Sequence, residues 1–284
     1  MTLRELIKYG ETTLQEAGIE DYVSDTRLLA MYAFNLDYTG LMMNMQEEMP
    51  DEDAEYYKGY IDIRSTHLPC HHITGCQEFM GYEFKVDENV LIPRQETELL
   101  VEEALKCADG INPCKALDVC CGSGCIGISF ALKRKEAGYH NDKVMMLDIS
   151  KQAINLAKEN ILKLEADCEI IKSDLFEHVE EKYDIIISNP PYIRTAEIEG
   201  LMEEVRCHEP RLALDGGEDG LYFYDRIIKE ARKFLYEDGM LLFEIGYDQY
   251  EDVRRLLVDA GYSDVRLIKD YAGLDRVVTA VKAK

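Results

Sequence analysis

Short apolar runs alternate with amphipathic stretches from about residue 92 to the end of the chain, and this alternation is what most constrains the fold. The runs lie at 116–121, 144–149, 169–172, 183–188, 240–245, 265–268 and 277–281. Helical spacing of apolar residues is found between them, at 126–135, 151–162, 222–235 and 250–260. The pattern predicts an α/β fold with an open, mostly parallel sheet covered by helices on both faces. The last two strands are separated by too few residues for a crossover helix, so we predict an antiparallel hairpin at the end of the sheet.

The first 75 residues have a different pattern. Their apolar residues recur at helical spacing, for example at Leu3, Leu6 and Ile7 and within 23–34 and 56–63, so we expect a small helical domain over 1–75. Residues 76–92 are predicted to form a hairpin-like connector that turns at 87–89. The α/β domain is then expected over 93–284.

Composition limits the possible partners. The 284-residue chain has 32 basic and 56 acidic residues and a formal net charge of −24, which disfavours extended binding to nucleic acid. It has no apolar run of the roughly 20 residues that a membrane span needs, and its N-terminus lacks the apolar core of a signal peptide. We therefore expect a cytoplasmic protein with no membrane partner.

The nine cysteines are an odd number at irregular spacing, which favours reduced thiols. Cys70, His71, His72 and Cys76 cluster, but their spacing matches no standard zinc pattern. We expect no metal site.

Glycines follow the first predicted strand of the α/β domain. The loop is Cys120-Cys121-Gly122-Ser123-Gly124, and a helix is predicted after it. Glycines let the backbone turn tightly and approach a ligand closely. The loop is a poor match to the dinucleotide fingerprint, because the final glycine is out of register.

Acidic residues lie at the ends of the next two strands. Asp148 follows Gly124 by 24 residues and could accept hydrogen bonds from both hydroxyls of a ribose. Asp174 could accept from the amino group of adenine, with Leu175 against the ring. Each aspartate could instead cap the helix that follows it. Their positions at consecutive strand ends favour a nucleoside ligand.

The most specific motif is Asn189-Pro190-Pro191-Tyr192, directly after the apolar strand 183–188. Two prolines remove two backbone donors and stiffen the chain, and the exposed carbonyls and the Asn189 side chain then form a cluster of acceptors. Acceptors beside an aromatic ring suit a planar NH₂ group. A rigid turn is the simpler alternative for a Pro-Pro pair.

This motif resembles that of amino-group methyltransferases that use S-adenosylmethionine (SAM). Further segments resemble the release factor glutamine methyltransferases of the PrmC/HemK type. They are Ile73-Thr-Gly, Glu78-Phe with Gly81, Phe84 and Val86, Val90-Leu-Ile-Pro-Arg-Gln-Glu-Thr-Glu, Glu209-Pro-Arg-Leu-Ala-Leu-Asp-Gly-Gly-Glu-Asp-Gly-Leu, Glu244-Ile-Gly-Tyr and Asp270-Tyr-Ala-Gly-Leu-Asp-Arg-Val-Val. The resemblance implies a class I SAM-dependent methyltransferase, with a Rossmann-like seven-stranded sheet whose last strand is antiparallel and a small N-terminal helical domain for substrate recognition.

The resemblance also implies roles for residues. The methionine part of SAM, and of the product S-adenosylhomocysteine, would lie at Cys120–Gly124, with Asp148 at the ribose and Asp174 and Leu175 at the adenine. Asn189, Pro190, Pro191 and Tyr192 would hold the substrate, which is the glutamine of the GGQ motif of a peptide chain release factor, and methylation would be at its amide nitrogen N5. The family usually has glycine at the position of Cys120, often an aromatic residue at Leu175 and proline at Gln95. We expect the enzyme to be a monomer.

Other classes of protein remain as alternatives. A DNA or RNA amino-methyltransferase that modifies adenine N6 would share the Asn-Pro-Pro-Tyr motif and SAM, but it should have a basic face. A nicotinamide-dependent oxidoreductase would share the sheet, but it would leave this motif without a role. A non-catalytic nucleotide-binding protein would have no reason to place acceptors beside the ligand.

Overall fold

The computed structural model describes residues 1–283, which form two compact units. One unit comprises residues 1–76 together with 202–208. The other comprises 77–201 and the described residues from 209 onward. The short segment 202–208 therefore groups with the N-terminal residues, although it directly follows the region of the Asn-Pro-Pro-Tyr motif in the chain.

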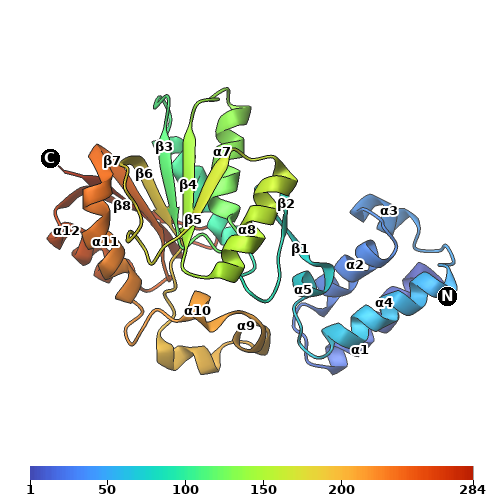
Figure 1. The fold of residues 1–284 in the computed structure, drawn as a ribbon. Helices are drawn as coiled ribbons and strands as arrows, with labels where there is room; N and C mark the ends of the chain where they lie inside the picture. Colours follow the sequence, from blue (N-terminus) through green and yellow to red (C-terminus); the bar gives the residue numbers. More distant parts are fainter. Residues whose placement is uncertain (284) are drawn as a thin grey trace. The chain divides into compact units, whose positions relative to one another are not determined.

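The second unit is built on a seven-stranded sheet with the order β5-β4-β3-β6-β7-β9-β8 (Figure 1). Strands β3 to β7 are parallel, whereas β9 is antiparallel to both of its neighbours. The strands are β3 (Lys115–Val119), β4 (Lys143–Asp148), β5 (Cys168–Lys172), β6 (Tyr183–Ser188), β7 (Leu235–Glu244), β8 (Tyr262–Lys269) and β9 (Asp275–Lys282). This is the predicted α/β sheet, and the predicted antiparallel hairpin at its end is confirmed.

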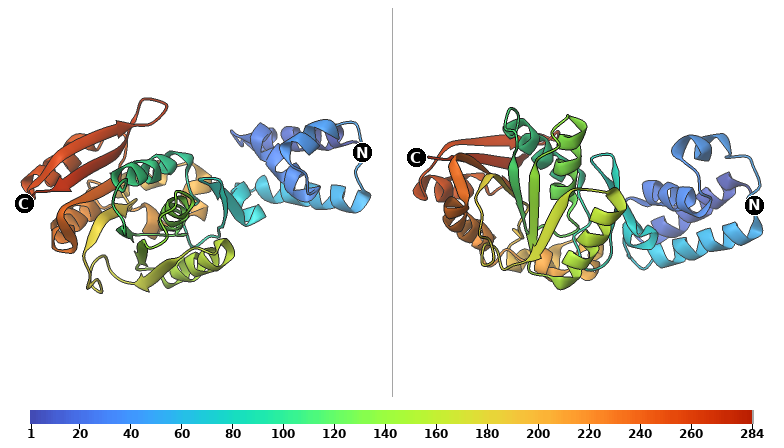
Figure 2. Two further views of the ribbon diagram at one scale, coloured as in Figure 1. Left: turned by 90° about the horizontal axis from the view of Figure 1, so that it is seen from above. Right: turned by 45° about the horizontal axis from the view of Figure 1, so that its top comes forward.

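Helices cover both faces of the sheet (Figure 2). One face packs against α11 (Tyr222–Phe234) and α12 (Tyr250–Asp259), and the other packs against α6 (Glu98–Cys107), α7 (Cys125–Glu136) and part of α8 (Lys151–Leu164). Alternate residues of one strand enter the two cores, because side chains of a strand point to opposite faces. In β6, Ile186 joins the first core, whereas Ile185 and Ile187 join the second. This explains why the central strands are apolar throughout.

The sequence located most of these elements to within a few residues. The largest error concerns the start of β7, which is at Leu235, whereas residue 240 was predicted. The first part of this strand was missed because Glu237, Asp238 and Gly239 have the composition of a turn. Asp238 has a φ of 63° there, and the pairing of β7 with β6 shifts register just before Met240. The helix α6 and the short helices η1 (Gln95–Thr97), η2 (Thr195–Gly200), α9 (Glu203–His208) and α10 (Arg211–Leu214) were not predicted.

The predicted position of the connector turn was wrong. The hairpin consists of β1 (Cys76–Phe79) and β2 (Tyr82–Lys85), so its two-residue turn is Met80-Gly81 rather than 87–89. Both turn residues have positive φ, 55° and 81°, as a tight hairpin turn requires. Residues 90–92 are not a strand, and the apolar side chains of Val90 and Ile92 are buried instead.

The first unit is helical, as expected. Its helices are α1 (Leu3–Glu16), α2 (Tyr22–Ala33), α3 (Tyr38–Met43), α4 (Asp51–Arg64) and α5 (Cys70–Thr74), and α9 belongs to the same unit. Arg64 is buried between two carboxylates: its Nε lies 2.7 Å from Asp25, and its Nη2 pairs with Glu204 of α9. This buried pairing ties segment 202–208 to the helical unit. Across residues 1–283, none of the helices is long and apolar enough to cross a membrane.

Candidate active site

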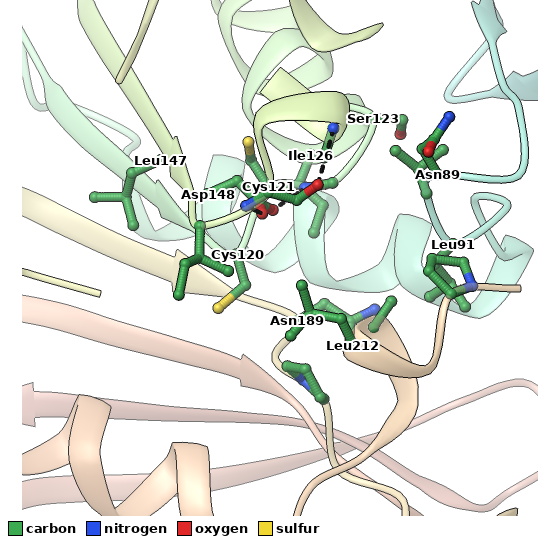
Figure 3. Close-up of a pocket in the computed structure, with 18 of the residues that line it drawn as sticks. Asn89, Leu91, Cys120, Cys121, Ser123, Ile126, Leu147, Asp148, Asn189 and Leu212 are labelled. Carbon is green, nitrogen blue, oxygen red and sulfur yellow. Dashed lines mark hydrogen bonds between the residues drawn. The ribbon is translucent and has the colours of Figure 1, made fainter. Parts of the chain in front are cut away.

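A cavity of about 520 Å³ opens at the carboxyl ends of β3, β4, β5 and β6. The chain continues from β3 to β4 and β5 on one side, and then returns to add β6 on the other side of β3. This reversal of strand order creates a crevice in which open α/β sheets bind ligands. Cys120, Asp148 and Asn189 gather around the cavity from three neighbouring strand ends (Figure 3).

The loop after β3 forms one wall of the cavity through Cys120, Cys121, Gly122 and Ser123. Gly124 does not line it, but its φ of 80° lets the chain enter α7, where Gly124 is the N-terminal cap. Cys120 has a φ of 62°, a conformation that costs a residue with a Cβ more than it costs glycine. Burial raises the pKa of the Cys120 thiol, so this group stays neutral beside the cavity.

Asp148 is held by backbone amides. Its Oδ2 accepts a hydrogen bond of 2.9 Å from the Gly122 N–H, and its Oδ1 accepts one of 2.8 Å from the Ser150 N–H. Burial raises the pKa of the Asp148 carboxyl, and these N–H groups counteract that effect. Asp148 does not cap α8, because the Ser150 hydroxyl accepts from the Ala153 N–H in that role.

Asp174 and Leu175 line the cavity beyond β5. Asp174 is paired with Arg226 of α11, with a distance of 3.0 Å between Oδ1 and Nη1, and its side chain is 43% exposed. Only Oδ1 is engaged in this ion pair. Leu175 is buried in the apolar core.

The Asn-Pro-Pro-Tyr motif contributes two of its four residues to the cavity. Asn189 and Pro191 line it, whereas Pro190 and Tyr192 do not. Tyr192 packs against the core, and its hydroxyl donates a hydrogen bond of 3.3 Å to Oε1 of Glu244. The Tyr192 ring is therefore placed as a support of the loop.

Two buried side chains contact the Asn-Pro-Pro-Tyr motif. The Asn189 Nδ2 donates to the hydroxyl of Thr97 at 3.4 Å, and Glu244 accepts from the Tyr192 hydroxyl. Thr97 and Glu244 are each only 2% exposed. Burial raises the pKa of Glu244, and the nearby Thr97 hydroxyl and the charge of Arg276 counteract that effect.

The loop is also supported through its backbone. A Cβ on Gly216 would lie 2.7 Å from the Tyr192 Cα, so only glycine fits against the loop at this position. The buried Gln249 donates a hydrogen bond of 3.0 Å from Nε2 to the Tyr192 carbonyl. These contacts give structural roles to Gly216 and to Gln249, since both residues hold the backbone of the loop at Tyr192.

Comparisons with known proteins agree with this geometry. Residues 95–218 match the family model of the methyltransferase small domain, and residues 5–75 match that of the PrmC N-terminal domain. The release factor glutamine methyltransferase of Clostridium botulinum is 42% identical over 99% of this chain and 100% of its own length. That of Geobacter sulfurreducens is 38% identical over 98% of this chain and 95% of its own.

The chain belongs to the release factor glutamine methyltransferase family. As a member it is a SAM-dependent methyltransferase with the class I fold, and the predicted fold and family are confirmed. A methyltransferase from Pyrococcus furiosus, at 18% identity and a TM-score of 0.52, has a similar fold over 72% of this chain and 90% of its own.

The sequence of this methyltransferase did not predict the two side chains that contact the Asn-Pro-Pro-Tyr motif, Thr97 and Glu244. Thr97 and Glu244 lie within segments that carry the family resemblance, but their distance in the sequence from the Asn-Pro-Pro-Tyr motif gave no sign that they contact it. Arg226, Leu212 and Ala213 also line the cavity without having been predicted. Over residues 1–283, no group of three or more His, Cys, Asp or Glu side chains is arranged to hold a metal ion.

Proposed function

We propose that this methyltransferase transfers the methyl group of SAM to the side-chain amide nitrogen of the glutamine in the GGQ motif of a peptide chain release factor. The observation that carries the proposal is the orientation of Asn189. Its Nδ2 is engaged by Thr97, which leaves its Oδ1 as an acceptor beside the cavity. An acceptor at this position suits the N–H of a primary amide.

The residues around the cavity fit SAM. A volume of about 520 Å³ is within the usual range for sites of small ligands and cofactors. Asp148 supplies a fixed carboxylate for the ribose hydroxyls, and Asp174 and Leu175 supply an acceptor and an apolar contact for the adenine. The loop Cys120–Gly124 would border the methionine part. When bound, SAM supplies an electrophilic methyl group on a sulfonium.

The protein's own contribution is to position the nucleophile. An amide nitrogen is a poor nucleophile, because its lone pair is delocalised into the carbonyl. The Asn189 side chain and a main-chain carbonyl of the proline pair would accept from the two N–H bonds, increase electron density on nitrogen and direct its lone pair at the methyl group. Orientation of this kind can supply several kcal/mol, within the ~7–11 kcal/mol known for well-oriented reactions. The proton would leave after transfer, so no strong base is needed.

The proposal assigns recognition of the release factor to the helical domain over 1–75, with a connector over 76–92 and catalysis over 93–284. The net charge of −24 favours a substrate with a basic surface, since opposite charges steer encounter. The same charge disfavours nucleic acid as a partner. We further propose that the enzyme works as a monomer in the cytoplasm, where release factors are found.

The test is incubation of the protein with SAM and a purified release factor, followed by mass spectrometry of the GGQ peptide. We expect a mass increase of one methyl group on the glutamine. Wild-type protein that leaves the glutamine unmodified but methylates adenine in an oligonucleotide would overturn the proposal and favour the nucleic acid alternative.

A further inference from the structure

Arg94 lines the cavity but has no role in the mechanism above. Among the described residues around the cavity, the only basic side chains are Arg94 and Arg226, whereas Glu88, Asp148 and Asp174 are acidic. Arg226 is paired with Asp174, at a distance of 3.0 Å, on the side assigned to the adenine. Arg94 is therefore the cation that can serve another part of a ligand.

A buried carboxylate fixes the Arg94 side chain. Its Nη2 lies 2.6 Å from Oε1 of Glu209, whose side chain is only 1% exposed, whereas that of Arg94 is 40% exposed. A buried charge is tolerated when it is paired, so Glu209 and Arg94 hold each other in place. A guanidinium has five N–H donors, and within residues 1–283 neither Nε nor Nη1 of Arg94 makes a hydrogen bond. The pairing thus leaves a fixed cation with free donors beside the cavity.

The backbone places Arg94 near Asn189. The Arg94 carbonyl accepts from the Thr97 N–H at 3.1 Å, and the Thr97 hydroxyl accepts from Nδ2 of Asn189 at 3.4 Å. Pro210, which directly follows Glu209 in the chain, lines the same cavity. The methyl group of SAM has to meet its acceptor at Asn189, so the methionine part of the cofactor belongs at this end of the cavity.

The methionine part carries the one anionic group of SAM, a carboxylate, together with a positive ammonium and a positive sulfonium. The acidic side chains around the cavity suit the two positive groups and repel the carboxylate. Backbone N–H groups at the start of a helix are the usual alternative for an anion. At the start of α7, however, the Gly122 N–H already donates to Asp148, and the Gly127 N–H donates to Asp118. A further carboxylate there would lie beside the charge of Asp148.

We propose that Arg94 binds the carboxylate of SAM, and that Glu209 is a positioning residue that holds the guanidinium for it. One guanidinium can pair with two carboxylates, because its donors point along different edges of the same plane. The inference uses the proposed position of the methyl acceptor at Asn189, but its test needs no acceptor.

The test compares SAM with decarboxylated SAM, which differs only in lacking the carboxylate. Calorimetry gives the Kd of each ligand for the wild type and for Arg94→Met, which keeps a long side chain and removes the cation. We expect Arg94→Met to raise the SAM Kd by about 10- to 100-fold, or ~1.4–2.8 kcal/mol, and to change that of decarboxylated SAM by less than about 2-fold. Arg226→Met is the matched control, since it removes the other basic side chain of the cavity. It should change the two Kd values by the same factor.

Removal of Arg94 alone leaves the buried Glu209 unpaired, so a second variant combines Arg94→Met with Glu209→Gln. This double variant removes both charges, and a thermal melt shows that it is folded. It should show the same selective loss of SAM affinity. Glu209→Gln alone keeps the cation but loosens it, so it should raise the SAM Kd by about 3-fold and leave that of decarboxylated SAM unchanged.

Two results would overturn the proposal. One is a wild-type SAM Kd in Arg94→Met, and the other is an equal change for the two ligands in the double variant. If the SAM Kd is unchanged and the KM for the release factor rises, Arg94 binds the methyl acceptor instead. Because the two Kd values are measured without an acceptor, a failure of the proposed function would leave this result standing.

Discussion

On the cofactor side of the cavity, which Cys120–Ser123 and Asp148 line, the backbone N–H groups of Gly122 and Ser150 hold the Asp148 carboxylate. On the acceptor side, side chains from distant segments support the Asn-Pro-Pro-Tyr loop: Thr97 bonds the Asn189 amide, and Glu244 bonds the Tyr192 hydroxyl. The first arrangement depends on a local turn and a neighbouring strand. The second depends on the whole fold. We expect substitutions on the first side to change cofactor affinity and those on the second to change the rate of transfer.

The largest expected effect is on the acceptor side. Asn189→Ala removes the proposed acceptor for the glutamine amide, so single-turnover transfer should fall by about 100- to 1,000-fold, as when one oriented polar group is removed from an active site. The SAM Kd should stay nearly unchanged. Asn189→Asp should also be impaired, because it loses the NH₂ group that bonds Thr97. If Asn189→Ala transfers methyl near the wild-type rate, the motif serves only as a rigid turn.

Asp148→Ala is the corresponding change on the cofactor side. It removes a carboxylate that is proposed to accept from the ribose, so SAM binding should weaken by about 1–3 kcal/mol, or roughly 5- to 150-fold. Calorimetry with SAM or S-adenosylhomocysteine measures this directly. A folded variant with wild-type affinity would mean that Asp148 serves only to hold the Gly122 and Ser150 amides.

Asp118, a buried residue of β3, tests the contacts that support the loop on the cofactor side. Its Oδ2 accepts from the Gly127 N–H in α7, and burial together with the charge of Asp148 raises its pKa to about 8. The folded-state pKa lies above the unfolded value of about 3.9, so its contribution to stability is complete below about pH 4 and is lost as the pH rises through 8. Asp118→Asn should flatten the decline in Tm over that range. An unchanged slope in a thermal melting series would contradict this.

The smallest expected effect is at Cys120. Glycine would relieve the strain of a left-handed conformation, which costs about 1–2 kcal/mol. It would also give the unfolded chain more conformational entropy, which lowers the free energy of unfolding by about 0.4–1 kcal/mol. Cys120→Gly should therefore stabilise the protein by between 0 and about 1.6 kcal/mol and bind SAM at least as well. Cys120→Val should destabilise it, because a β-branched residue is poorly tolerated at positive φ. Denaturant unfolding of the two variants measures the difference, and equal stabilities would argue against strain at this position.

The same contrast explains what the sequence could and could not predict. The glycine loop, Asp148 and Asn189 each follow directly after an apolar strand, and parallel strands bring their carboxyl ends together, so the site could be predicted from local pattern and topology. Thr97, Glu244 and Gln249 join the site only through packing of distant segments, which has no periodic signal.

The hairpin turn was misplaced because 87–89 is as rich in turn-forming residues as Met80-Gly81. Segment 202–208 belongs to the helical unit, where its residue Glu204 pairs with the buried Arg64. The sequence gives no sign that Arg64 is buried.

The most direct test of the division between the two sides is the single-turnover rate of methyl transfer measured as a function of SAM concentration for Asp148→Ala and Asn189→Ala. The predicted curve for Asp148→Ala is shifted to higher SAM and reaches a plateau close to that of the wild type. That for Asn189→Ala is half-saturated at the wild-type SAM concentration and has a plateau lower by about 100-fold or more. If Asp148→Ala lowers the plateau without shifting the curve, or if Asn189→Ala shifts the curve and keeps the plateau, the division is contradicted.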